Sequence, residues 1–270
     1  SLKYKYCTEQ LEKILISLNH YENIQAIGSR KVGIYKFIKN LLPNFDVMLD
    51  LSKSDSIASF LTINRMIIDY YAVFYLIASH STIKERNIRY YMYLIDGINT
   101  RSKTMINFEA KVSKKVHEYN KTERNSVLEK DRISVIQLFA LIEKENLDNQ
   151  ISTMIIKQSN WKFIDAESSK SIRENSYSWV KLYNLAKIPD KYSASFQSYY
   201  STFVHGLGTT LMSNSNYDKL PIICSSLYLT SIIQSFIIKI ILIEYKEELT
   251  GYELNSDFEK YINLNWESWR

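Results

Sequence analysis

The sequence predicts an all-α protein built as a single-domain bundle of roughly eight to ten helices. Only six glycines and three prolines occur in 270 residues, too few for the many tight turns of an all-β fold. Apolar residues recur at three- and four-residue spacing through most of the chain. Hydrophobic residues make up 46% of it and charged residues 23%, the balance of a folded domain rather than a disordered one.

Apolar spacing and helix-terminating residues divide the chain into ten helical segments. The apolar face of the first segment consists of Leu11, Ile14, Leu15 and Leu18, and Pro43 ends the second segment. The third, 55–79, is apolar on nearly all sides and should be central. Thr82 and Glu85 have capping-box spacing at the start of the fourth. The expected helices cover 3–26, 29–42, 55–79, 82–119, 122–144, 148–158, 176–188, 190–205, 221–248 and 256–266.

Domain organisation follows from the absence of repeats, low-complexity blocks and linkers in the sequence. We expect one helical domain over 1–270, with N-terminal helices at 1–50, a core bundle at 54–248 and a C-terminal tail helix at 249–270. The stretch SNWKFIDAESSKSIRENS mixes aromatic residues with many serines and charges, which predicts an irregular connection.

The segment 220–243 is apolar and about long enough to cross a bilayer. It also contains Gln234 and Lys239, and a lysine in the inner half of a span costs a few kcal/mol. A buried core helix is the favoured interpretation, so we expect no membrane span. A transmembrane helix is the alternative.

Several kinds of chemistry lack their sequence motifs. Cys7 and Cys224 match no metal or redox spacing and fit a reducing, cytoplasmic setting, and no signal-peptide pattern is present. There is no glycine-rich phosphate loop, no nucleophile elbow and no zinc motif. We therefore expect no cofactor and no metal.

The net charge of +5 permits contact with nucleic acid without arguing for it, because 34 basic residues face 29 acidic ones. The run 114–124 is basic but interleaved with glutamates, which is typical of a solvated helix end. Expected partners are a nucleic acid or an anionic small molecule, and a homodimer stays open.

Arg65 and Asp69 are the first candidate binding residues. They stand four residues apart, so they share one face of a helix that is otherwise almost entirely apolar. A buried charge must be paired or hydrogen-bonded. The two residues therefore form either an ion pair that organises the core or the lining of a polar pocket between helices.

Arg89, Tyr90 and Tyr93 are candidates on the next helix, where Arg86 and Arg101 extend the same stripe. Such a stripe can bind phosphate and stack on a base. It can equally be a solvated face with tyrosines packed along its margin.

Ser201 and His205 form the third group, at the end of a helical segment that stops at two glycines. A histidine at a helix C-terminus is stabilised by the helix dipole. His205 could instead be a catalytic general acid or base, because its pKa lies near neutrality.

These three groups together resemble a group of bacterial all-helical proteins of unknown function. That group shares an arginine four residues before an acidic residue, an Arg-Tyr helix and a late Ser-x-x-x-His-Gly element. The resemblance covers roughly 54–212, and the group more often has Glu where this chain has Asp69. A looser resemblance is to HEPN-type helical domains, many of which are RNases of toxin and phage-defence systems. Their signature has Arg separated from His by four to six residues on one helix, and no histidine here has an arginine five to seven positions before it.

Three hypotheses of function follow. In the first, Arg65, Arg89 and His205 converge on a polar pocket that binds an anionic ligand, a nucleotide or RNA. In the second, the protein is a metal-independent RNase in which His205 transfers protons. In the third, it is a structural or protein-interaction module and these groups are core hydrogen bonds.

Overall fold

The computed structural model describes residues 2–54, 56–109, 114–189, 193–194, 198 and 219–252, and its fold is all-α as predicted. Within these residues the helices are α1 (Leu2–Ser17), the 3₁₀ helix η1 (Asn19–Tyr21), α2 (Arg30–Leu51), α3 (Ile57–Ala78), α4 (Ile83–Glu109), α5 (Lys114–Glu145), α6 (Thr153–Lys157), α7 (Trp179–Leu185) and α11 (Lys219–Glu244). The helices expected at 190–205 and 256–266 lie outside the described residues, apart from three positions of the first.

The chain divides into two compact units. Unit 1 consists of Ser1–Gln25, Lys31–His80 and Ser178–Arg270. Unit 2 consists of Ala26–Arg30 and Ser81–Tyr177. The single domain expected over 1–270, with its parts 1–50, 54–248 and 249–270, stays a prediction.

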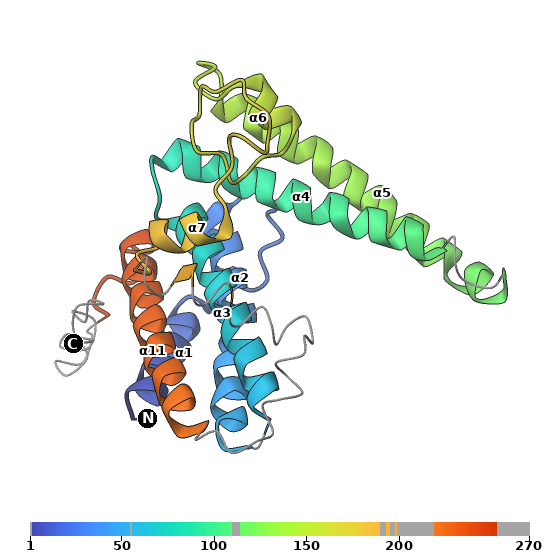
Figure 1. The fold of residues 1–270 in the computed structure, drawn as a ribbon. Coiled ribbons are helices and arrows are strands. Elements are labelled where there is room, and N and C mark those ends of the chain that lie inside the picture. The colour runs from blue at the N-terminus through green and yellow to red at the C-terminus, as the bar shows by residue number, and fades with distance from the viewer. Residues whose placement is uncertain are drawn as a thin grey trace. The chain divides into compact units, whose positions relative to one another are not determined.

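Unit 1 is built around α3 and α11, with α1 and α7 packed against them (Figure 1). Both central helices bury residues on nearly every side, as their apolar composition predicts. The core also takes the predicted apolar face of α1, which includes Leu11 and Ile14. Polar residues of α11 pair within this core, since Gln234 Nε2 donates to Thr8 Oγ1 of α1 over 2.8 Å.

Two helices of unit 1, α3 and α11, are long and apolar enough to cross a membrane. Most of the apolar window is buried inside the protein in each case, 67% in α3 and 72% in α11. Core helices of soluble proteins meet the same criteria, so the expected absence of a membrane span stays a prediction.

Helix α2 does not end at Pro43, and the prediction of a helix end there was wrong. Leu41, Phe45 and Met48 are fully buried along one face, and this face continues across the proline. Packing of such a face stabilises a helix more than local propensity does, and it outweighs a proline cost of about 3 kcal/mol. The side chain of Asn44 also donates to the carbonyl of Asn40 over 3.1 Å in the disturbed turn.

Unit 2 is a long helical hairpin in which α4 and α5 run antiparallel (Figure 1). The single helix expected over 82–119 is divided, because α4 ends at Glu109 and α5 begins at Lys114. Pairing gives both helices a buried side, on which Met92 and Ile142 are fully enclosed. One continuous helix would leave such residues exposed to solvent. Packing between α4 and α5 therefore determines that the expected helix is divided, although no glycine or proline marks the point of division.

The predicted irregular connection is confirmed in unit 2. Residues 158–178 carry no helix, and an isolated antiparallel bridge joins Phe163 to Ser176. Asn175 organises the turn, since its Oδ1 accepts from the backbone N–H groups of Ile164 and Asp165 at 3.2 and 2.9 Å. Asn160 donates to the Asn175 carbonyl over 2.8 Å. These buried amides supply the backbone partners that a helix would otherwise provide.

Candidate functional site

Arg65 and Asp69 form the ion pair expected from their spacing on α3. Arg65 Nε lies 3.0 and 2.9 Å from the two carboxylate oxygens of Asp69. The arginine is buried, while the Asp69 side chain keeps 29% of its surface exposed. Tyr183 of α7 donates its hydroxyl to the same carboxylate. The centre of the Tyr183 ring lies 5.5 Å from the guanidinium carbon of Arg65. The pair therefore joins α3 to α7 within unit 1.

Tyr183 acts only as a donor in this cluster. Burial raises the pKa of its phenol well above the ordinary value, and the negative charge of Asp69 raises it further. The hydroxyl is therefore protonated near neutral pH and can donate to the Asp69 carboxylate. A tyrosine of α3 contacts the same end of unit 1's α7, since Tyr71 donates to the carbonyl of Ala186, the residue after α7, over 2.8 Å.

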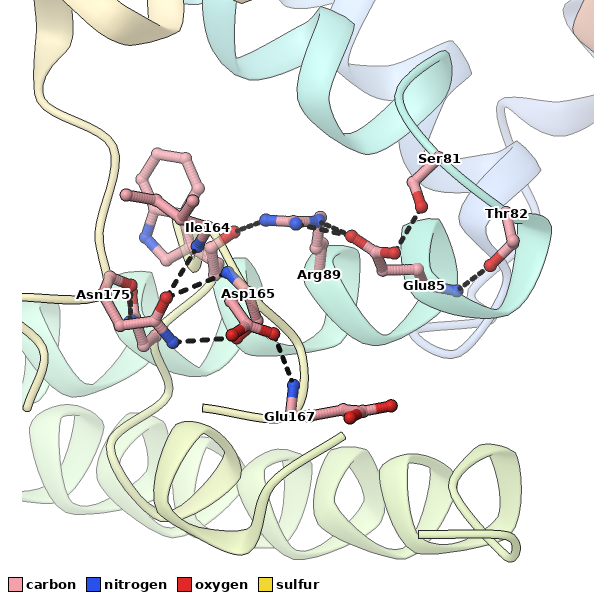
Figure 2. A network of polar contacts seen from close by, with 10 residues as sticks. Ser81, Thr82, Glu85, Arg89, Ile164, Asp165, Glu167 and Asn175 are labelled. Atoms are coloured by element: carbon pink, nitrogen blue, oxygen red, sulfur yellow. Dashed lines mark hydrogen bonds and ion pairs between the residues drawn. The ribbon is translucent and has the colours of Figure 1, made fainter. Parts of the chain in front are cut away.

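Arg89 lies at the centre of a network in unit 2 (Figure 2). Its Nε and Nη2 donate to Glu85 Oε1 at 3.0 and 2.5 Å, and its Nη1 donates to the carbonyl of Trp161 at 2.9 Å. The guanidinium carbon lies 3.6 Å from the centre of the Phe163 ring, and the side chain is fully buried. Burial lowers the arginine pKa, and the charge of Glu85 opposes this shift. Arg89 therefore holds the irregular connection on α4.

The capping box at the start of α4 is only half formed. Thr82 Oγ1 accepts from the Glu85 backbone N–H over 3.2 Å, as the spacing predicts (Figure 2). The carboxylate of Glu85 does not accept from the backbone N–H of Thr82, the bond that would complete the box. It accepts from Ser81 Oγ and from Arg89, so one glutamate links the helix start to the buried arginine.

Tyr90 and Tyr93 are not on an exposed stripe with Arg89. Tyr90 is buried and its hydroxyl bonds the carbonyl of Ile27 over 3.4 Å. Burial raises the pKa of Tyr90 to about 12, with a further contribution from Tyr91. Tyr93 packs edge-on against Trp161 with ring centres 5.1 Å apart. Both rings are thus engaged within unit 2.

Ser201 and His205 lie outside the described residues, so the catalytic role predicted for His205 stays a prediction. Arg65 belongs to unit 1 and Arg89 to unit 2. The convergence of Arg65, Arg89 and His205 on one pocket also stays a prediction.

No family model, no curated protein and no solved structure matches this chain. The resemblances to a bacterial helical group and to HEPN-type domains therefore stay predictions. Among the described residues, no group of three or more histidine, cysteine, aspartate or glutamate side chains is placed to hold a metal ion.

Positive charge is distributed unequally between the two units. Unit 1 contains 16 basic and 16 acidic residues, and unit 2 contains 18 basic and 13 acidic residues. The whole excess of +5 is therefore in unit 2. Residues 101–132, at the end of the hairpin where α4 leads into α5, contain 9 basic and 5 acidic residues, a net +4.

The basic end of the hairpin, residues 101–132, offers accessible cations. Lys103, Lys121 and Lys130 are exposed and make no hydrogen bond or ion pair with any described residue. Charge counted over the whole chain hides this concentration, because neutral unit 1 dilutes it. A count along a sliding window of about 30 residues would have revealed it from the sequence.

Proposed function

We propose that this protein binds RNA through the basic end of the α4–α5 hairpin. The observation that supports this proposal is the confinement of the chain's excess positive charge to unit 2, with a net +4 over 101–132. Lysines that neutralise phosphates release condensed counterions, and this release is the main source of sequence-independent affinity for nucleic acids.

The length over which the basic positions of α5 are spread favours a nucleic acid over a compact anion. The basic positions of α5 between Lys114 and Arg132 span about 27 Å at 1.5 Å per residue. That length corresponds to roughly eight phosphates along one strand of a duplex. A single phosphate or carboxylate would engage only a small part of that length.

The arginines proposed from the sequence fit this function less well. Arg89 is fully buried and its Nε, Nη1 and Nη2 all donate within unit 2, so it holds the fold of that unit. Arg65 is buried and paired with Asp69 in unit 1. The geometry of these two residues supports the hypothesis of core hydrogen bonds.

Fluorescence anisotropy with labelled 12-nucleotide oligouridine and a 12-base-pair RNA duplex tests the proposal. We expect Lys103→Glu/Lys121→Glu/Lys130→Glu to weaken binding by at least tenfold. The slope of log K against log salt should fall in magnitude by about 2 for the single strand, because three phosphate contacts are lost.

The matched control is Lys5→Glu/Lys13→Glu/Lys181→Glu, which places the same charge change on exposed lysines of unit 1. It should leave binding within about twofold of wild type, because the proposed phosphate contacts are made by lysines of unit 2. Equal losses in both variants, or no RNA binding by wild type, would refute the proposal. Binding to phosphatidylserine vesicles without RNA binding would also refute it. Electrophoresis of the bound RNA separates binding from cleavage, and cleavage would instead support the RNase hypothesis.

A further inference from the structure

Arg101 differs from the other described cations of the basic end because a buried carboxylate holds it. Its Nε lies 3.1 Å from Asp131 Oδ2, and its Nη2 donates to Asp131 Oδ1. Ser102 Oγ donates to Asp131 Oδ2 over 3.1 Å. The Asp131 side chain is only 6% exposed, whereas that of Arg101 is 57% exposed. The carboxylate is therefore fixed between the helices while the arginine reaches the surface.

The bonds to Asp131 use one edge of the guanidinium. The Nη1 group has no hydrogen-bond partner among the described residues, although a guanidinium carries five N–H donors in a rigid plane. A long exposed side chain normally loses rotamer freedom when it binds a ligand. Here Asp131 has already removed much of that freedom, so the remaining N–H groups are oriented before a ligand arrives.

We infer that Arg101 is a preorganised phosphate-binding residue of the basic end, with Asp131 and Ser102 as its positioning residues. This inference rests on the proposed RNA-binding function. Arginine suits the role because its planar fork can donate two parallel hydrogen bonds to a phosphate, whereas a lysine acts as a point charge. The exposed lysines of the basic end then supply general attraction, and Arg101 supplies a directional contact.

Substitution of Asp131 tests the inference, because two explanations predict opposite changes in RNA affinity. Asp131→Asn raises the net charge of the basic end by one, so attraction by charge alone predicts tighter RNA binding. If Asp131 orients Arg101, the same change frees the arginine and weakens binding despite the added charge. We expect Asp131→Asn to weaken binding about fivefold, which is less than the loss of one charge-assisted hydrogen bond.

Arg101→Lys keeps the charge and removes the planar fork, and we expect about tenfold weaker binding with an unchanged salt slope. Arg132→Lys is the matched control, because Arg132 pairs with Glu129 on the same hairpin and both side chains are more than half exposed. The affinity of Arg132→Lys for RNA should change less than twofold. Thermal melting of each variant identifies any loss of folded protein.

Tighter binding by Asp131→Asn, or equal effects of Arg101→Lys and Arg132→Lys, would overturn this inference. The triple lysine variant separates it from the proposed function. If that variant weakens binding and Arg101→Lys does not, the RNA-binding proposal stands and the role of Arg101 is wrong. If neither variant changes binding, both are wrong.

Discussion

Tyr183 of α7 donates its hydroxyl to the Asp69 carboxylate of α3, across 114 positions of sequence. The same carboxylate accepts both contacts from Arg65 Nε, so a buried arginine and a buried tyrosine share one acidic partner. This arrangement joins two helices of unit 1 with a charge-assisted hydrogen bond, which is stronger than a neutral one.

Tyr183→Phe removes that hydrogen bond and keeps the ring. We expect the free energy of unfolding to fall by about 1.5–3 kcal/mol, the range for a hydrogen bond to a charged group. Urea denaturation followed by circular dichroism measures the change. Tyr70→Phe is the control, because Tyr70 packs on Phe37 and makes no hydrogen bond through its hydroxyl to a described residue. Equal stabilities of the two variants would contradict this role of Tyr183.

Arg89→Met should destabilise unit 2. The change leaves Glu85 without its cation and the Trp161 carbonyl without a donor, and breaking a buried pair costs about 3–5 kcal/mol. The irregular connection should open first, because Arg89 holds it on α4. Limited trypsin digestion should therefore cut faster at Lys162, Lys170 and Arg173.

Arg132→Met provides the comparison for Arg89, because it removes an exposed arginine from a surface pair on α5. Surface pairs contribute only about 0–1 kcal/mol, so its digestion rate should match that of wild type. Similar digestion rates for Arg89→Met and Arg132→Met would rule out a structural role for Arg89.

The sequence predicts where the described helices lie, because that information is local, but not where each one ends. The first helix, expected over 3–26, ends at Ser17. Apolar spacing identifies α1, α3 and α11, and the Thr82–Glu85 spacing marks the start of α4. Pro43 shows the limit of such rules, since the buried face that continues through it depends on packing with other helices.

The partners of the candidate residues could not be predicted in the same way. The i to i+4 spacing indicates the Arg65–Asp69 pair, but nothing near it in the chain indicates Tyr183. Asp131 lies 30 positions from Arg101, and their pairing depends on how α5 folds back along α4. Contacts of this kind are decided by tertiary structure.

Lys187 offers a test of backbone strain. It follows Ala186, the C-cap residue of α7, and its φ is 67°. The N–H of Ile188 donates to the carbonyl of Tyr183 over 2.9 Å, and a helix end of this kind favours glycine at the position of Lys187. Lys187→Gly should therefore raise the free energy of unfolding by about 0.5–1 kcal/mol. Lys181→Gly, within α7, should lower it by about 1 kcal/mol. Urea denaturation of both variants measures these opposite changes in the free energy of unfolding. A loss of stability in Lys187→Gly would show that the backbone at Lys187 is not strained.

Glu248 should contribute a pH-dependent part of the stability of unit 1. It accepts 2.7 Å bonds from Tyr21 Oη and Lys31 Nζ. Burial alone would raise its pKa, but the hydrogen bonds from Lys31 and Tyr21 outweigh burial and lower it. A pKa lower in the folded than in the unfolded state means that folding favours the ionised form. The resulting stabilisation is present above about pH 4.5 and is lost as the pH falls through the folded-state pKa.

Melting temperatures measured between pH 7 and pH 3 test this expectation. Glu248→Gln should melt below wild type at pH 7, and the difference should shrink toward pH 3 as wild type protonates the carboxyl. Glu247→Gln is the control, since Glu247 is exposed and its side chain makes no hydrogen bond to a described residue. A difference between wild type and Glu248→Gln that stays constant from pH 7 to pH 3 would show that hydrogen bonding, rather than ionisation, is the source of the stabilisation.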